Sequence, residues 1–276
     1  MIDFHTHIFP EKIADRTIAH LAAICHAEPY IEPYTNGKQE GLLESMEKAG
    51  VDCSVNLPVV TSPSQFRSVN QFAANLQHGR IISFGGIHPQ SADYKNELKY
   101  IKSLGIKGIK LHPDYQETYF NDISYKRIIS YASELDLIVA VHAGLYPKSP
   151  KDIHCTPQMD DEVIKEVSPT KMILAHMGGN EMWDDVERYL VGKNVWFDTG
   201  VVLDTIPQEQ FLRIVRTHGA DKILFATDSP WAGQKEYADY FQSLPMTAEE
   251  KECILHKNAE KLLRYSNKMV DGKKSA

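Results

Sequence analysis

The chain has 276 residues, which is a normal length for one α/β barrel and too long for one small domain. Its 42% hydrophobic residues are typical of a globular protein, and a net charge of −7 without a basic stripe argues against a nucleic-acid partner. No apolar run approaches the roughly 20 residues that span a bilayer, and residues 1–10 do not resemble a signal peptide. The chain is therefore expected to be cytoplasmic, with no membrane partner. Its cysteines form no C-x-x-C motif and are expected to be free thiols: Cys25, Cys53, Cys155 and Cys253.

Short apolar segments alternate with longer amphipathic stretches along the chain. Most of these segments are apolar on both faces, which is typical of strands in a buried parallel sheet. The predicted strands are Ile2–His7, Asp52–Leu57, Ile81–His88, Ile106–His112, Leu137–His142, Met172–His176, Val195–Asp198 and Ile223–Asp228.

The stretches between the predicted strands have helical periodicity. Gly41–Ala49 and Ser124–Leu135 each place apolar residues on one stripe. A last helix is predicted to begin at Thr247, with a capping box between Thr247 and Glu250. A strand followed by a helix eight times predicts a (β/α)₈ TIM barrel. The runner-up, a doubly wound open sheet, lacks its G-x-G-x-x-G motif after the first strand.

The domain organisation expected from this pattern is simple. A single domain should cover residues 1–264, and residues 265–276 should form a disordered tail, because they are polar and lysine-rich. The longest connections, 57–64 and 144–158, follow strands, so they should lie on the active-site side of a barrel.

The histidines are concentrated at one position relative to the predicted strands. Six of the twelve fall at the C-terminal ends of predicted strands, where barrel enzymes gather their catalytic residues. They are His5, His7, His88, His112, His142 and His176. Because His5 and His7 are two residues apart, both should point to the same face of a strand, and two imidazoles there can bind one metal ion.

Each of these residues alone also has an ordinary structural explanation. His142 or His176 could be a core histidine bonded to a backbone carbonyl, and Asp228 could cap the helix that follows it. Packing gives no reason, however, to bring several imidazoles and a carboxylate to one barrel mouth. The joint pattern therefore predicts a metal site there.

Five motifs carry a resemblance to a known family: DFHTHIFP, GIKLHP, VAVHAG, ILAHMGG and ILFATDSPW. Together they resemble the amidohydrolase superfamily, and most closely the "amidohydrolase 2" branch that contains aminocarboxymuconate-semialdehyde decarboxylase. The likeness runs from Ile2 to about Leu263. It implies a distorted TIM barrel with one divalent metal ion, zinc first among the candidates.

The resemblance also implies roles for individual residues. The metal ligands would be His5, His7, His142 and Asp228. His176 would orient or deprotonate a metal-bound water, or contact the substrate. Asp228 and His176 are accordingly the candidate catalytic residues, as proton acceptors and donors.

Lys110 and three neighbours are the candidate substrate-binding residues. Lys110 could bind a substrate carboxylate, pair with a nearby acid, or bridge two metal ions as a carbamate, a binuclear option that the sequence does not favour. His88 and His112 could line the pocket or simply be satisfied beside a proline turn. Trp231 follows the last predicted strand closely enough to contact a substrate.

These residues predict a metal-dependent hydrolase that opens an amide, cyclic amide, ester or lactone bond of a small polar molecule. The alternative is a metal-dependent, non-oxidative decarboxylase of a small unsaturated or aromatic acid. A non-enzymatic metal-binding barrel is a third and weaker reading. The only partner predicted is the small-molecule substrate, and a homodimer is one option for the oligomeric state.

Overall fold

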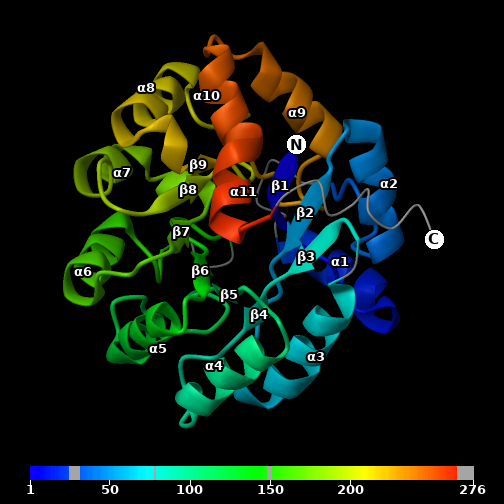
Figure 1. Cartoon of the computed structure of the whole chain (residues 1–276), viewed down its shortest axis with the longest axis vertical. Coiled ribbons are helices and arrows are strands. Elements are labelled where there is room, and N and C mark those ends of the chain that lie inside the picture. Colours follow the sequence, from blue (N-terminus) through cyan, green and yellow to red (C-terminus); the bar gives the residue numbers. More distant parts are fainter. Residues whose placement is uncertain (25–31, 78, 148–150, 266–276) are drawn as a thin grey trace.

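The computed structural model describes residues 1–24, 32–77, 79–147 and 151–265. Strands lie at the centre of the molecule and helices surround them (Figure 1). The strands are β1 (Ile2–Thr6), β2 (Cys53–Asn56), β3 (Ile81–Ser83), β4 (Gly85–Gly86), β5 (Gly108–Leu111), β6 (Ile138–Val141), β7 (Met172–Leu174), β8 (Trp196–Asp198) and β9 (Ile223–Leu224).

Most helices lie around the outside of the strands, and α11 (Asn258–Leu263) lies across one end of them (Figure 1). The other helices are α1 (Glu11–Ile24), α2 (Gln39–Ala49), α3 (Phe66–Leu76), α4 (Tyr94–Ser103), α5 (Ile123–Glu134), α6 (Pro157–Val167), α7 (Trp183–Tyr189), α8 (Gln208–His218), α9 (Gln234–Ser243) and α10 (Ala248–Glu252). Short helical turns are η1 (Pro63–Gln65), η2 (His176–Gly178), η3 (Ala220–Lys222) and the π-helical η4 (Cys253–Lys257).

All strand pairs are parallel, and neighbours in the chain are neighbours in space. The order is β1-β2-β3 in one sheet and β4-β5-β6-β7-β8-β9 in the other. Only Phe84 separates β3 from β4. At the other seam, the Phe4 amide donates to the Phe225 carbonyl at 2.9 Å and the Asp228 amide donates to the His5 carbonyl at 2.8 Å.

These bonds join β1 to the chain at and beyond β9, so the strands form a distorted ring, and the predicted TIM barrel in a single domain is confirmed. Several predicted strands are longer than the observed ones, so His142, His176 and Asp228 lie just beyond β6, β7 and β9 and not within them, and one predicted strand is divided. The segment Ile81–His88 is divided into β3 and β4, because the chain leaves the regular pairing at Phe84. His88 lies beyond both.

The barrel interior is apolar at one end. Phe4, Phe84, Ile138, Ile173 and Leu224 belong to one buried cluster, which α11 joins through Ala259, Leu262 and Leu263. Burial of each large side chain contributes about 1.5–3 kcal/mol, so this apolar cluster stabilises the barrel. The polar residues at the strand ends are therefore left to the opposite mouth.

Gly41–Ala49 and Ser124–Leu135 correspond to α2 and α5, and the capping box is present, with Thr247 Oγ1 accepting from the Glu250 amide at 3.1 Å. Cys53, Cys155 and Cys253 are free thiols, whereas Cys25 lies outside the described residues. The predicted tail lies outside them too, apart from Tyr265. Within the described ranges, no helix has the length and apolar character to cross a membrane.

Candidate metal centre

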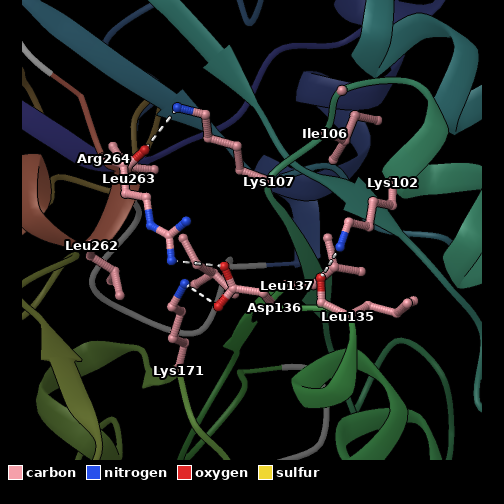
Figure 2. Close-up of a pocket in the computed structure, with 12 residues that line it drawn as sticks. Lys102, Ile106, Lys107, Leu135, Asp136, Leu137, Lys171, Leu262, Leu263 and Arg264 are labelled. Atoms are coloured by element: carbon pink, nitrogen blue, oxygen red, sulfur yellow. Dashed lines mark hydrogen bonds and ion pairs between the residues drawn. The ribbon is translucent and has the colours of Figure 1, made fainter.

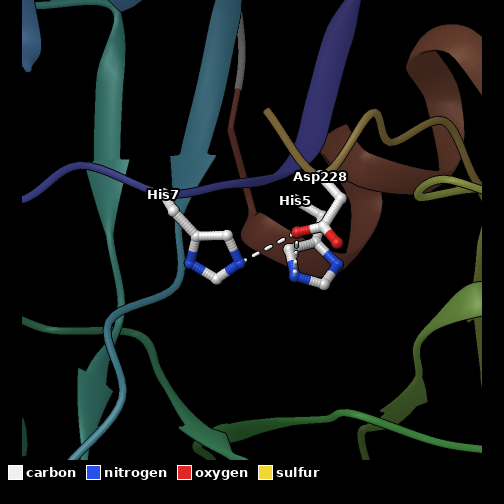
Figure 3. Close-up of side chains that lie close together, drawn as sticks. All are labelled: His5, His7 and Asp228. Carbon is white, nitrogen blue, oxygen red and sulfur yellow. Dashed lines mark ion pairs between the residues drawn. The ribbon is translucent and has the colours of Figure 1, made fainter. Parts of the chain in front are cut away.

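Three side chains converge at the mouth of the barrel (Figure 3). His5 belongs to β1, His7 follows it, and Asp228 follows β9. Asp228 Oδ1 lies 3.2 Å from His5 Nε2 and 2.9 Å from His7 Nε2. One ligand atom from each of the three lies within 4.8 Å of the others, a spacing suited to one divalent ion. The predicted convergence of His5 and His7 is therefore seen, together with the carboxylate from the far end of the chain.

The backbone at this point departs from regular strand geometry. The register of β1 against β2 shifts between Asp3 and Thr6, and such irregularities re-aim side chains next to active sites. Asp228 adopts a left-handed φ of 63° immediately before the Ser229-Pro230 turn. The ligand-bearing segments thus leave the sheet where their side chains meet.

Asp198, at the end of β8, fixes the orientation of the His5 ring. His5 Nδ1 lies 3.0 Å from Asp198 Oδ2, and both side chains are 1% exposed. A carboxylate accepts, so Nδ1 carries the proton and Nε2 keeps its lone pair toward Asp228. Burial, followed by the Lys110 charge, lowers the pKa of His5 to about 4, which keeps the ring neutral and able to bind a metal.

A second chain of hydrogen bonds runs through His176 and His142. His176 Nδ1 lies 2.9 Å from the Gly200 carbonyl, which can only accept, and His176 Nε2 lies 2.9 Å from His142 Nδ1. In the tautomer of His176 that carries its proton on Nδ1, Nε2 accepts, so His142 donates from Nδ1 and its own Nε2 carries a bare lone pair. That Nε2 is buried and has no hydrogen-bond partner in the described structure.

The unpartnered His142 nitrogen suits a metal ligand. Leaving such an acceptor buried costs about 1–3 kcal/mol unless something occupies it. Burial, with His112 next, lowers the pKa of His142 well below its ordinary value, so the ring is neutral. The donor set of His5, His7 and Asp228 therefore fits a divalent ion. The ligand atoms that lie within 4.8 Å of one another do not include a nitrogen of His142, so its place as fourth ligand stays a prediction.

Lys110 lies inside this centre. It is the third residue of β5, it is 1% exposed, and its Nζ lies 3.2 Å from His5 Nε2. Burial lowers the pKa of Lys110 to about 8, against the opposing charges of Asp198 and Asp228. No ion pair of Lys110 with a carboxylate occurs within 4.0 Å among the described residues, so the acid-pairing interpretation finds no support.

Aromatic rings line one side of the centre. The His112 ring stacks on His142, with centroids 4.1 Å apart, and on Tyr115, with centroids 3.8 Å apart. Tyr146 meets His112 and His142 edge to face. This wall adjoins the bare nitrogen of His142 and offers flat surfaces to a planar ligand.

The other two candidate substrate-binding residues are less tightly linked to the centre. His88 is 5% exposed, and its Nδ1 accepts from the Gln90 amide at 3.2 Å, a local turn contact. The Trp231 backbone amide donates to the Asp228 carbonyl at 3.0 Å, which places it beside the ligand in the chain. Among the described residues, no hydrogen bond, ion pair or ring contact joins either side chain to His5, His7 or Asp228.

Sequence reasoning missed Asp198 and Tyr115. Asp198 ends a predicted strand as the histidines do, and this position was the available signal. Tyr115 follows the predicted strand Ile106–His112 by three residues, in a turn that periodicity does not describe.

A family model for amidohydrolases matches residues 2–265, nearly the whole chain. The chain belongs to the amidohydrolase family. The resemblance noted in the five motifs is thereby confirmed. A comparison with curated protein sequences found no relative.

Solved structures similar to this amidohydrolase show the same fold at low identity. An uncharacterized TIM-barrel protein from Bordetella bronchiseptica is 20% identical, with a TM-score of 0.75 over 96% of this chain and 98% of that one. The 5-carboxyvanillate decarboxylase from Sphingomonas paucimobilis is 16% identical, with a TM-score of 0.72 over 96% and 99%.

A third similar structure contains a metal ion. It is a dihydroxybenzoic acid decarboxylase from a Polaromonas species with bound manganese and the inhibitor 2-nitroresorcinol. It is 17% identical, with a TM-score of 0.71 over 95% of this chain and 96% of that one.

Proposed function

We propose that the protein is a metal-dependent, non-oxidative decarboxylase of a small aromatic or unsaturated carboxylic acid. The observation that carries this proposal is the position of Lys110, a buried cation 3.2 Å from His5 in the ligand cluster. A buried cation beside a metal centre suits a substrate whose carboxylate must lose its hydration. The two decarboxylases of the same fold support this choice over the hydrolysis that the sequence suggested first.

The ring stack beside His142 supports a planar substrate. Tyr115, His112 and His142 form parallel layers, and Tyr146 closes one edge. An aromatic acid could lie against this wall while its carboxylate approaches Lys110. A divalent ion held by His5, His7 and Asp228, with His142 proposed as the fourth ligand, would supply a Lewis acid that anchors oxygen atoms of the substrate.

The residues of the chain then carry out the proton chemistry. The bond between the ring carbon and the carboxylate carbon breaks, carbon dioxide leaves, and the electron pair stays on the ring carbon. That carbon must take up one proton. Asp228 is an anion, because His5 and His7 lower its pKa against the effect of burial, so we propose that it takes a proton from solvent water and passes it to the ring carbon. His176 holds the tautomer of His142 through the Gly200 carbonyl, and Lys110 binds the substrate carboxylate before the bond breaks.

The metal is proposed to be a single divalent ion of unassigned identity. The imidazole-rich ligand set suits zinc, as expected from the sequence, whereas the decarboxylase from Polaromonas has manganese. Elemental analysis of the purified protein, followed by reconstitution of the chelated protein with each ion, distinguishes the two.

The test is carbon dioxide release from a panel of hydroxybenzoates and muconate-type acids. We expect activity that the His5→Ala/His7→Ala double variant and the Asp228→Asn variant lose. His20→Ala, an exposed histidine on α1, is the matched control and should keep full activity. A panel that yields no carbon dioxide, while amides or lactones are opened, would replace this proposal with hydrolysis at the same centre.

A further inference from the structure

A cavity of about 360 Å³ lies at the end of the barrel away from the histidines. Ile106 and Lys107 come just before β5, Leu137 just before β6 and Lys171 just before β7, so the cavity is at the N-terminal strand ends. The end of α11 closes one side through Leu262, Leu263 and Arg264 (Figure 2). This cavity is therefore separate from the candidate metal centre, which lies at the C-terminal strand ends.

The lining of this cavity is strongly cationic. It contains the four cations Lys102, Lys107, Lys171 and Arg264 and the single carboxylate of Asp136, which leaves three positive charges in excess. The chain as a whole has a net charge of −7. A local excess of this sign is therefore a specific feature of this end of the barrel and attracts anions.

Ion pairs and hydrogen bonds fix the positions of these cationic side chains around the cavity. Lys171 Nζ and Arg264 Nη2 lie 2.6 Å and 3.1 Å from the two oxygens of Asp136 (Figure 2). Lys107 Nζ donates to the Leu263 carbonyl at 2.7 Å. A neutral carbonyl leaves the ammonium charge uncompensated and uses one of its three donors.

The Lys107 ammonium is also crowded by like charge. Burial lowers the pKa of Lys107, and the Arg264 guanidinium acts in the same direction. A negatively charged group placed between these side chains would relieve that repulsion. The guanidinium can add paired hydrogen bonds to a carboxylate or phosphate, and the ammonium adds a point charge.

Apolar side chains form the rest of the wall. Ile106, Leu137 and Leu263 are at most 3% exposed, and Leu262 is 6% exposed. We propose that this cavity binds a small organic anion, with its acidic group between Lys107, Lys171 and Arg264 and its apolar body against Leu137 and Leu262. A volume of about 360 Å³ is within the usual range for small-molecule sites. The site does not depend on the function proposed for the metal centre.

Isothermal titration of the whole protein with naphthalene-1-sulfonate, a stable aromatic anion, tests this site. We expect one saturable site per chain at low ionic strength. Lys171→Gln should weaken binding about tenfold, a change of about 1.4 kcal/mol, and Lys107→Gln should act in the same direction. Lys235→Gln is the matched control, because Lys235 also pairs with one aspartate, Asp239 at 2.8 Å, but lies on α9 away from the cavity.

Three results would each overturn the proposed anion site. Binding that is equal in Lys171→Gln, Lys107→Gln and Lys235→Gln would place the anion elsewhere, including at the metal centre, and would overturn the proposal. Absence of saturable binding to the wild-type protein would overturn it as well. Equal binding of the neutral analogue 1-naphthalenemethanol would show that the cations do not recognise the ligand. Circular dichroism of each variant confirms that the fold is intact, and none of these readouts requires decarboxylation.

Discussion

At the scale of single residues, the protonation of ring nitrogens determines which atoms can hold a metal ion. Asp198 and the Gly200 carbonyl each accept from a histidine Nδ1, and these two contacts leave a lone pair on Nε2 of His5 and on Nε2 of His142. Asp198 is itself held as an anion: burial would raise its pKa, but the effects of His5, including its hydrogen bond, together with those of His176 and Lys110 outweigh burial and lower the pKa to about 2. The orientation of the ligands therefore depends on residues that need not touch the ion.

The variant Asp198→Asn tests this dependence. Its amide can donate to His5 Nδ1, which would move the His5 proton to Nε2 and remove the lone pair that faces Asp228. We expect metal affinity to fall about 10- to 100-fold, the usual effect of losing such a partner. Competition of the purified protein with a fluorescent chelator measures the affinity.

Two comparisons control this experiment. Asp239→Asn, on the exposed face of α9, should bind metal like the wild-type protein. Oδ1 of Asp198 also accepts from the His176 and Gly200 amides at 3.0 Å, and the asparagine oxygen can keep these bonds, so the fold should be retained. Unchanged affinity in Asp198→Asn would show that His5 is oriented by other contacts.

At the scale of elements, the loops after β6 and β7 must lie against each other for His142 and His176 to meet. Gly144 pairs with Asn180 in an isolated parallel bridge, and Gly144 has a φ of 85°. A Cβ built on Gly144 would lie 2.0 Å from the Asn180 amide nitrogen and 2.4 Å from the Gly179 carbonyl carbon. Only glycine fits there without separating the two loops.

Gly144→Ala should therefore lower the metal affinity of the centre, although Gly144 lies two residues after His142 in the chain. We expect the His142–His176 hydrogen bond to break, with a loss of metal affinity greater than any loss caused by Gly50→Ala. Gly50 is the matched control, because its φ of 67° imposes similar backbone strain while nothing lies within 4 Å of its added Cβ. Chelator competition and thermal midpoints of both variants measure this difference. Equal effects in the two variants would mean that backbone strain alone explains the loss.

The sequence predicted the elements better than it predicted the contacts between them. Alternating apolar strands and amphipathic stripes are local patterns, so the barrel and α2, α5 and the Thr247 capping box could be foreseen. The three-ring stack of Tyr115, His112 and His142 could not, because it depends on how two loops turn after their strands. The same holds for Lys110, whose contact with His5 joins residues 105 positions apart and follows only from closure of the barrel.

At the scale of the whole molecule, one buried carboxyl links folding stability to pH. Asp160, in the first turn of α6, is fully buried, and its Oδ1 accepts from the Cys155 thiol at 3.2 Å. Burial raises the pKa of Asp160 from 3.8 to about 8. Between these two values the folded protein keeps the proton and the unfolded chain releases it. The free energy of unfolding therefore falls as the pH rises from about 4 to about 8, by up to about 1.4 kcal/mol per pH unit from this group.

Asp160→Asn should remove this slope, because the amide stays neutral at every pH and its oxygen can still accept from Cys155. We expect the free energy of unfolding of the variant to rise relative to that of the wild-type protein between pH 5 and pH 8. The substitution can also change stability by an amount that is the same at every pH, and this does not affect the slope. Urea unfolding at several pH values, with chelator present to exclude metal release, measures the difference. Asp161→Asn is the control: Asp161 pairs with Lys193 at 2.9 Å, its pKa is lowered, and it is ionised in both states over this range. Parallel pH profiles for Asp160→Asn and the wild-type protein would show that Asp160 is already ionised in the folded protein.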